Sequence, residues 1–489
     1  MLYFLQSTKK YYSAHALHGA KKHRMRLLFM NNTIFQDSNI KRSYFKLSIP
    51  LVLSLVVTLI YNLADTFFVA QTGDTNIIAG VSLGAPVFTL LMAFGNIFAQ
   101  GGSSRLSILM GENKKQDARR VGAFCFYALL ATGIVAAVFM LLFRAPIVSL
   151  LGATEDTVLP TTEYFTFLAL GAPAVMISFV HSNLLRSEGK STLSMIGTVG
   201  GALVNIILDP ILISGLKMGA MGAAIATVIG YVLTDIYYIV VVIRHSEMLS
   251  MKLSDALIPL KSVGKIFAVG TPAAIVNIMQ SVCVILINQY LLPFGTDKIA
   301  AMGIAMKVSM IALLILTGFA FGGAPLFGYY YGAKDRDSLR KLLRFCLVFI
   351  LGLGLVLAVA IFFAAPALMN VFTTNQSVAS DAAFMLRMQA ITTPCVGLIL
   401  LLTIIFQSFG KSVGSFILSI SRQGVIFVAV LMLASHLAGY SGILITQAVS
   451  DVLSTLIAIV LFRFMLKGEF EEPQKKKASS QQLRLNQAR

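Results

Sequence analysis

The chain has 489 residues, of which 57% are hydrophobic and 12% are charged. This balance excludes a soluble globular domain and predicts a protein that crosses a membrane several times. The net charge of +18 would suit a nucleic-acid partner only if the basic residues formed one face. They fall instead in short segments between apolar stretches, so we expect no nucleic-acid partner.

Residues 1–43 are basic and lack an uninterrupted apolar core, which predicts a disordered tail and neither a signal peptide nor a span. Apolar segments long enough to cross about 30 Å of hydrocarbon then recur along the chain. We expect twelve spans, at 48–71, 77–104, 119–143, 160–186, 191–214, 219–243, 263–293, 298–330, 339–365, 381–408, 414–436 and 440–466. The charged stretch 467–489 has no fold signal.

The basic residues between the spans predict the orientation of the chain. The second and eighth breaks, "GENKKQDARR" and "GAKDRDSLRKLLR", are rich in lysine and arginine, and the other even breaks are also basic. The odd breaks carry few cations, which are Arg144, Lys217 and Lys298. Even breaks and both termini are therefore expected on the cytoplasmic side of the cell membrane.

The two halves of the chain repeat each other. A shift of 222 residues places Pro50 on Pro272, and after a one-residue deletion Gly101 falls on Gly322. The sequence thus predicts an all-α polytopic membrane protein with an internal duplication, in which two six-helix lobes surround a central cleft. The predicted lobes are 44–243 and 263–466, joined by a cytoplasmic linker at 244–262.

Acidic residues inside the spans are few, and each costs several kcal/mol if it is ionised and faces lipid. Asp65 in span 1 and Asp209 in span 5 both lie about 10 Å from the outer ends of their helices, at 1.5 Å per residue. Thr227 in span 6 falls near the same depth. Two carboxylates in one low-dielectric pocket cannot easily both ionise, so we expect a proton switch, although interhelical hydrogen bonds would be a simpler role.

Neighbouring polar residues support a site in the first lobe. Asn205 lies four residues before Asp209 and therefore on the same helix face. Pro210 leaves the carbonyl of Ile206 without its usual helical partner, which predicts a local bend. Tyr61 and Asn62 precede Asp65 by about one turn and are candidates for the substrate cleft.

The second lobe lacks this arrangement. Ile287 and Val430 stand at the repeat positions of Asp65 and Asp209. Its buried charges are mostly basic, namely Lys307, Arg387 and Arg422, with Asp451 the one acid. Lys307 and Arg387 are candidates for the substrate cleft, and the alternative for all three cations is snorkelling or pairing with Asp451.

Four stretches, "NLADTFF" in span 1, "LRSEGKS" after span 4, "NIILDPILISG" in span 5 and "GAAIAT" in span 6, resemble the multidrug and toxic compound extrusion (MATE) family. The resemblance covers residues 44–466. It implies an outward-open V of two lobes that exchanges an organic, usually cationic, substrate for H⁺ or Na⁺. It also implicates Asp65, Asn205 and Asp209 in ion coupling or Na⁺ binding, with Thr227 a weaker match. One branch of the family relies on acids in spans 7 and 10, which this sequence lacks.

The resulting hypothesis is a secondary active multidrug antiporter that needs no cofactor beyond its coupling ion, acts on small organic cations among membrane lipids, and functions as a monomer. A flippase for lipid-linked precursors shares the same plan and would use cations such as Lys307 and Arg387 to bind pyrophosphate. Export of an anionic or nonpolar compound fits the same residues. A membrane-embedded enzyme is disfavoured because the sequence has no HExxH, Walker A or serine-elbow motif.

Overall fold

The computed structural model describes residues 32–373 and 375–470, and these residues form a helical bundle. Residues 1–31 and 471–489 of the two predicted tails lie outside the described residues. Within residues 32–43 and 467–470 the prediction of no folded structure was wrong, because Asn32–Gln36, the residues from Ile40 on and Lys467–Phe470 are helical. The first half of the bundle contains α2 (Asn32–Gln36), α3 (Ile40–Ala70), α4 (Thr75–Gly111), α5 (Lys115–Leu142), α6 (Arg144–Leu150), α7 (Val158–Leu170), α8 (Ala172–Ser187), α9 (Ser191–Asp209), the π-helix η1 (Pro210–Gly215) and α10 (Gly219–His245).

A linker with the short 3-10 helix η2 (Leu253–Ala256) leads to the second half. This half contains α11 (Leu260–Leu291), η3 (Leu292–Phe294), α12 (Thr296–Gly322), α13 (Ala324–Gly332), α14 (Arg336–Phe372), α15 (Gln376–Ile391), α16 (Thr393–Ser408), α17 (Ser412–Ile420), η4 (Ser421–Val425), α18 (Ile426–Met465) and α19 (Lys467–Phe470).

The described residues account for all twelve predicted spans. Nine helical elements are long and apolar enough to cross a membrane, and two bent helix pairs, α7 with α8 and α15 with α16, bring the number to 11. The twelfth comes from the 54-residue element Ser412–Met465, which reverses direction at Gly439. Gly439 has a φ of 54° and a ψ of −127°, a conformation open essentially to glycine alone. A β-carbon on Gly442 would lie 1.8 Å from the carbonyl oxygen of Ala434, so the chain folds back as a helical hairpin.

The observed helices differ from the predicted spans at the start of the first span and within spans 4 and 10. The first span begins at Ile40 instead of 48, because the Asn39 side chain caps it by accepting a hydrogen bond from the Arg42 amide at 3.1 Å. Spans 4 and 10 are bent by 51° and 47°, which the hydrophobic pattern alone did not predict. Pro173 and Pro394 stand in the first turn after each bend, where a helix can restart but not continue. The irregularity expected at Pro210 is present, because α9 ends at Asp209 and six residues then wind as a π-helix.

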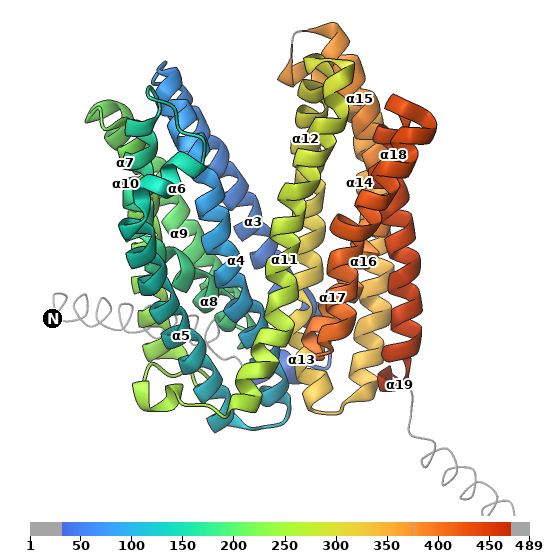
Figure 1. Ribbon diagram of the computed structural model, residues 1–489. Coiled ribbons are helices and arrows are strands. Elements are labelled where there is room, and N and C mark those ends of the chain that lie inside the picture. The colour runs from blue at the N-terminus through green and yellow to red at the C-terminus, as the bar shows by residue number, and fades with distance from the viewer. Residues whose placement is uncertain (1–31, 374, 471–489) are drawn as a thin grey trace, which may run out of the picture.

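The helices form the two predicted lobes, with α3 to α10 on one side and α11 to α19 on the other (Figure 1). The lobes diverge toward the end that carries α7 and α15 and come together toward the end that carries α13 and α19 (Figure 1). Across the lobes α4 packs against α11 and α13, and α3 packs against α12. The all-α, two-lobe fold expected from the sequence is therefore confirmed.

Glycines allow the helices of the two lobes to approach closely where the lobes meet. A β-carbon on Gly111 would lie 2.0 Å from the carbonyl oxygen of Tyr329, and one on Gly332 would lie 2.1 Å from that of Ile108. Gly111 and Gly332 are repeat partners, and so are Ile108 and Tyr329, so one contact is the copy of the other. Gly270 on α11 is tighter still, with the carbonyl oxygen of Ile97 at 1.9 Å from its ideal β-carbon. Apolar lipid gives helices little reason to associate through hydrophobicity, so this close packing is what holds the lobes together.

Substitution of Gly270 by alanine is expected to destabilise the protein by about 2 kcal/mol, because the added methyl overlaps the backbone of α4. Gly264 lies on the same helix with nothing within 4 Å of an added β-carbon, so Gly264→Ala is the matched control. Thermal unfolding of both purified variants in detergent measures the difference. Equal melting temperatures for the two variants would contradict close packing at Gly270.

Candidate functional site

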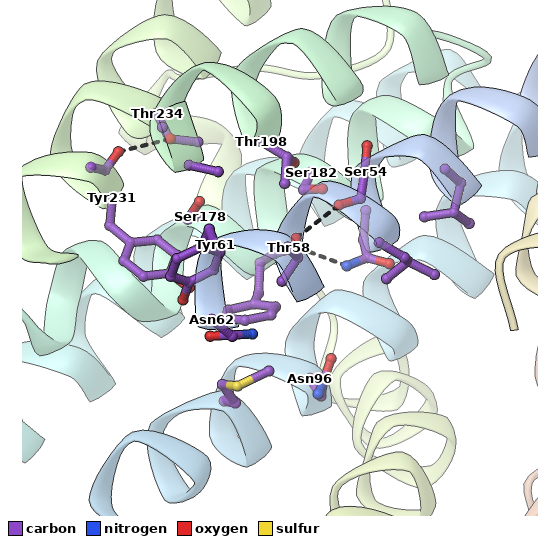
Figure 2. Close-up of a pocket in the computed structure, with 18 of the residues that line it drawn as sticks. Ser54, Thr58, Tyr61, Asn62, Asn96, Ser178, Ser182, Thr198, Tyr231 and Thr234 are labelled. Atoms are coloured by element: carbon purple, nitrogen blue, oxygen red, sulfur yellow. Dashed lines mark hydrogen bonds between the residues drawn. The ribbon is translucent and has the colours of Figure 1, made fainter. Parts of the chain in front are cut away.

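A cavity of about 390 Å³ lies within the first lobe and reaches the interface between the lobes. Its polar lining comes from α3, α4, α8, α9 and α10, and Figure 2 shows these side chains turned toward one space: Ser54, Thr58, Tyr61, Asn62, Asn96, Ser178, Ser182, Thr198, Tyr231 and Thr234. Phe88, Met92 and Phe179 supply apolar wall. The cavity therefore combines uncharged hydrogen-bonding groups with adaptable apolar surface, which is typical of sites for small organic molecules.

Asn205 and Thr227 line one side of this cavity, whereas Asp65 and Asp209 are not among its lining residues. The Asn205 amide donates to Oδ1 of Asp209 at 3.3 Å and to Oγ1 of Thr227 at 3.4 Å. Asp209 is fully buried and Asn205 is 3% exposed. Asn205 and Asp209 share a face of α9, as their spacing predicted, and α10 brings Thr227 to them.

Asp65 approaches this group from α3, which packs against α9. Asp65 is half-buried and near enough to Asp209 for the charges of the two carboxylates to interact. The Tyr164 phenol lies within electrostatic range of both. The structure thus groups Asp65, Asp209 and Thr227, which the sequence placed at one depth, with Asn205, which the sequence placed on the same helix face as Asp209.

Oxygen atoms in this group lack hydrogen-bond partners. Within residues 32–373 and 375–470, no donor reaches Oδ1 of Asp65, Oδ1 of Asn205 or Oδ2 of Asp209. A buried acceptor without a donor costs about 1–3 kcal/mol, so the arrangement favours a species that supplies positive charge or a proton. Carboxylate and amide oxygens are hard ligands of the kind that suit Na⁺, and a carboxylate can equally hold H⁺.

Tyr61 and Asn62 both line the cavity, one turn before Asp65 on α3. Tyr231 of α10 also lines the cavity, and Asn62 is exposed. Figure 2 shows Tyr61, Asn62 and Tyr231 on the same side of the space. Of these three, Tyr231 was not singled out as a site residue from the sequence.

Lys307 and Arg387 do not line this cavity. Lys307 is exposed on α12. Arg387 on α15 donates from Nε to the carbonyl oxygen of Phe362 at 3.1 Å, and its guanidinium carbon lies 5.3 Å from the Phe362 ring centroid. The structure therefore separates these two cations from the first-lobe group, and it gives neither of them Asp451 as a partner.

Asp451 in the second lobe is a fully bonded carboxylate, unlike Asp209. It accepts from Arg422 Nε at 2.8 Å, from Thr392 at 3.0 Å and from Gln447 at 3.0 Å. The pairing with Arg422 was one of the interpretations of the basic residues there. Asp235 on α10 is buried and does not line the cavity.

Sequence reasoning missed Arg186, the charged side chain that lines the cavity among the described residues. Arg186 lies at the end of α8 and donates to Ser182 at 3.1 Å and to Asn183 at 2.5 Å. Ser182 in turn contacts Ser194 of α9 at 3.0 Å, so the Arg186 guanidinium lies near the level of Ser194. Ser194 precedes Asn205 by eleven residues, which is about 16 Å along the helix axis. The available signal was an arginine at the very end of the predicted span 160–186.

The sequence profile of the MatE family matches two stretches of the chain, residues 50–211 and 272–433. The two matches are one profile applied twice, in agreement with the internal duplication. The multidrug export protein MepA of Staphylococcus saprophyticus is 29% identical over 427 residues, which cover 87% of this chain and 94% of that protein. MepA of Staphylococcus haemolyticus is 28% identical over the same length and with the same coverage.

Solved structures share the fold. An outward-facing multidrug resistance MATE family transporter of the MOP superfamily superposes with a TM-score of 0.84 at 24% identity, over 91% of this chain and 99% of that one. A MOP superfamily transporter from Pyrococcus furiosus, described as having reversed polarity in its binding pocket, gives 0.84 at 23% identity with the same coverage.

The two buried carboxylates are expected to respond in opposite ways to neutral substitution. Asp451→Asn should destabilise the protein by about 3 kcal/mol, because it leaves the Arg422 cation buried without its partner. Asp209→Asn should leave stability unchanged or raise it, because Asp209 has an unpartnered oxygen and a neighbouring carboxylate. Thermal unfolding in detergent at neutral pH tests both. A large loss of stability in Asp209→Asn would mean that this carboxylate has a structural role.

Proposed function

The chain belongs to the MatE family, the multidrug and toxic compound extrusion transporters, and we propose that it exports small organic cations in exchange for H⁺ or Na⁺. The observation that carries this proposal is the group of unpartnered oxygens on Asp65, Asn205 and Asp209. These atoms form a buried site with negative charge and no basic partner among the described residues. Such a site gains free energy whenever it takes up a cation or a proton.

Exchange follows if the substrate and the coupling ion use the same negative charge at different times. An organic cation in the cavity is balanced by ionised Asp65 or Asp209. Protonation of a carboxylate, or Na⁺ at Asp65, Asn205 and Asp209, neutralises the site and lowers the affinity for the substrate. Net transport then requires only that the two ligands differ in their affinities for the inward-facing and outward-facing states.

The position of Arg186 gives the bound cation a preferred place. Arg186 lies about 16 Å from the level of Asn205 along α9. Repulsion from this guanidinium directs the positive group of a substrate toward Asp65 and Asp209. Apolar parts of the substrate then contact Phe88, Met92 and Phe179, which can adapt to different shapes.

The proposed orientation places the end at which the lobes meet in the cytoplasm. The loops at that end carry the lysines and arginines of the even breaks, including Lys114, Lys115 and Lys334. The positive-inside rule then assigns both described ends of the chain, Asn32 and Phe470, to the cytoplasmic side. The lobes diverge toward the outside, and one chain supplies every residue of the proposed site, so a monomer suffices.

Ethidium transport into everted membrane vesicles tests the coupling. A proton gradient or a sodium gradient is expected to drive transport by the wild type, whereas Asp65→Asn and Asp209→Asn should lose about tenfold or more of the gradient-driven rate. Asp74→Asn is the matched control, because Asp74 is the N-cap of α4 and asparagine caps equally well. Transport that needs no gradient, or full activity in both site variants, would refute the proposal.

Asn205→Ala separates the two coupling ions. An amide oxygen can ligate Na⁺ but does not need to take part in protonation of Asp209, so the variant should lose sodium-driven transport if Na⁺ binds here. Proton-driven transport should fall by less than about threefold. The same vesicles, energised with each gradient in turn, give both rates. Equal losses under the two gradients would contradict a direct role of this amide in Na⁺ binding.

A further inference from the structure

A basic groove lies between the start of α3 and the start of α14, and it is separate from the first-lobe cavity. Its volume is about 950 Å³. Four cations line it, Lys41 from α3 and Arg340, Lys341 and Arg344 from α14, against one acid, Asp337. The Arg340 guanidinium donates to the carbonyl oxygen of Phe470 at 3.1 and 2.7 Å, so the groove lies at the end of the molecule that carries α19.

The described residues do not neutralise the charges of the basic groove. In the part of the chain that the structure describes, none of the four cations lies within 4.0 Å of a carboxylate oxygen. Lys41, Lys341 and Arg344 are exposed, and the Lys41 ammonium lies 5.6 Å from the centroid of the Phe345 ring. A cluster of this kind attracts an anion.

The walls of the groove continue as apolar surface toward the middle of the membrane. On α14 the helical spacing that joins Lys341 and Arg344 runs on through Val348, Leu351 and Leu355, which are 70%, 38% and 59% exposed. On α3, Ile49 and Leu53 are 46% and 48% exposed. Between the two helices the rings of Phe45 and Phe345 meet edge to face at 5.8 Å and form an apolar floor. The surface therefore has positive charge at the starts of α3 and α14 and exposed apolar residues farther along the same two helices.

We propose that the basic groove binds an anionic phospholipid. Lys41, Lys341 and Arg344 contact the phosphate, and the acyl chains lie along the exposed apolar residues of α3 and α14. A free phosphate would contact only the cations of the groove. A soluble acidic protein would not reach the apolar residues within the hydrocarbon region. The juxtaposition of both surfaces is what matches a lipid of the adjoining leaflet.

The internal repeat provides a matched control. Arg119 and Arg120 on α5 are the repeat partners of Arg340 and Lys341. In the first lobe the linker lies beside this position, because η2 packs on α5 and the exposed Arg119 donates to the carbonyl oxygen of Glu247 at 2.9 Å. Replacement of Arg119 and Arg120 thus removes the same charge at the equivalent place in the first lobe, where the linker adjoins α5.

Native mass spectrometry of the purified full chain tests the proposal with phosphatidylglycerol, phosphatidylcholine and inorganic phosphate. The wild type should retain phosphatidylglycerol in preference to phosphatidylcholine. Each cation near an anionic lipid contributes about fivefold in affinity, so Lys341→Gln combined with Arg344→Gln should weaken phosphatidylglycerol binding by about 25-fold. Arg119→Gln with Arg120→Gln should leave it unchanged, and Lys341→Arg with Arg344→Lys should retain it.

Three outcomes would overturn the proposal. The first is equal retention of phosphatidylglycerol and phosphatidylcholine by the wild type. The second is an equal loss in the α5 control, which would indicate nonspecific charge attraction. The third is displacement of phosphatidylglycerol by inorganic phosphate at millimolar concentration, which would indicate a site for a free anion. Unchanged thermal unfolding of the variants, whose substituted side chains are exposed, keeps a binding loss distinct from misfolding.

Discussion

The architecture depends on the close approach of backbones between the lobes. In lipid, helices gain little from burying apolar surface, so their association rests on van der Waals packing at short range. Three glycines allow this close approach, namely Gly111, Gly332 and Gly270. At each of them a β-carbon would overlap a carbonyl oxygen of the other lobe. These contacts lie where the lobes come together, and the opposite ends of the same helices are left to diverge. Closure at one end and separation at the other thus have a common cause.

The duplicated scaffold carries different chemistry in its two halves. Repeat-related features recur in the bends at Pro173 and Pro394, each of which packs beside a glycine, Gly133 and Gly354. The carboxylates do not recur. Asp451 is held by an arginine, a threonine and a glutamine, whereas Asp209 shares its surroundings with a second acid and keeps an oxygen without a donor. The first arrangement fixes a structure, and the second leaves a charge available for a ligand.

Cations are distributed in three environments with different consequences. Arg422 is buried and paired. Arg186 donates hydrogen bonds to uncharged groups beside the first-lobe cavity, so its positive charge still acts on that cavity. The cations of the basic groove face outward at the end where the lobes meet. Basic residues between spans predict the orientation of the chain, but burial and partners decide whether a given cation stabilises a helix pair, shapes a cavity or attracts a lipid.

The sequence alone determined the number of spans, the duplication and the common depth of Asp65, Asp209 and Thr227, because hydrophobic length, internal repeats and rise per residue are local properties of a helix. It also indicated that Asn205 and Asp209 share a face and that the helix is irregular after Asp209. Only the tertiary structure decided which side chains share a cavity. It placed Arg186 and Tyr231 in the lining and left Lys307, Arg387 and the two carboxylates Asp65 and Asp209 out of it, since the facing of one helix toward another depends on contacts across the lobe. It also decided that Asp451 is satisfied and Asp209 is not, because hydrogen-bond partners far apart in sequence are set by packing and leave no mark in the hydrophobic pattern.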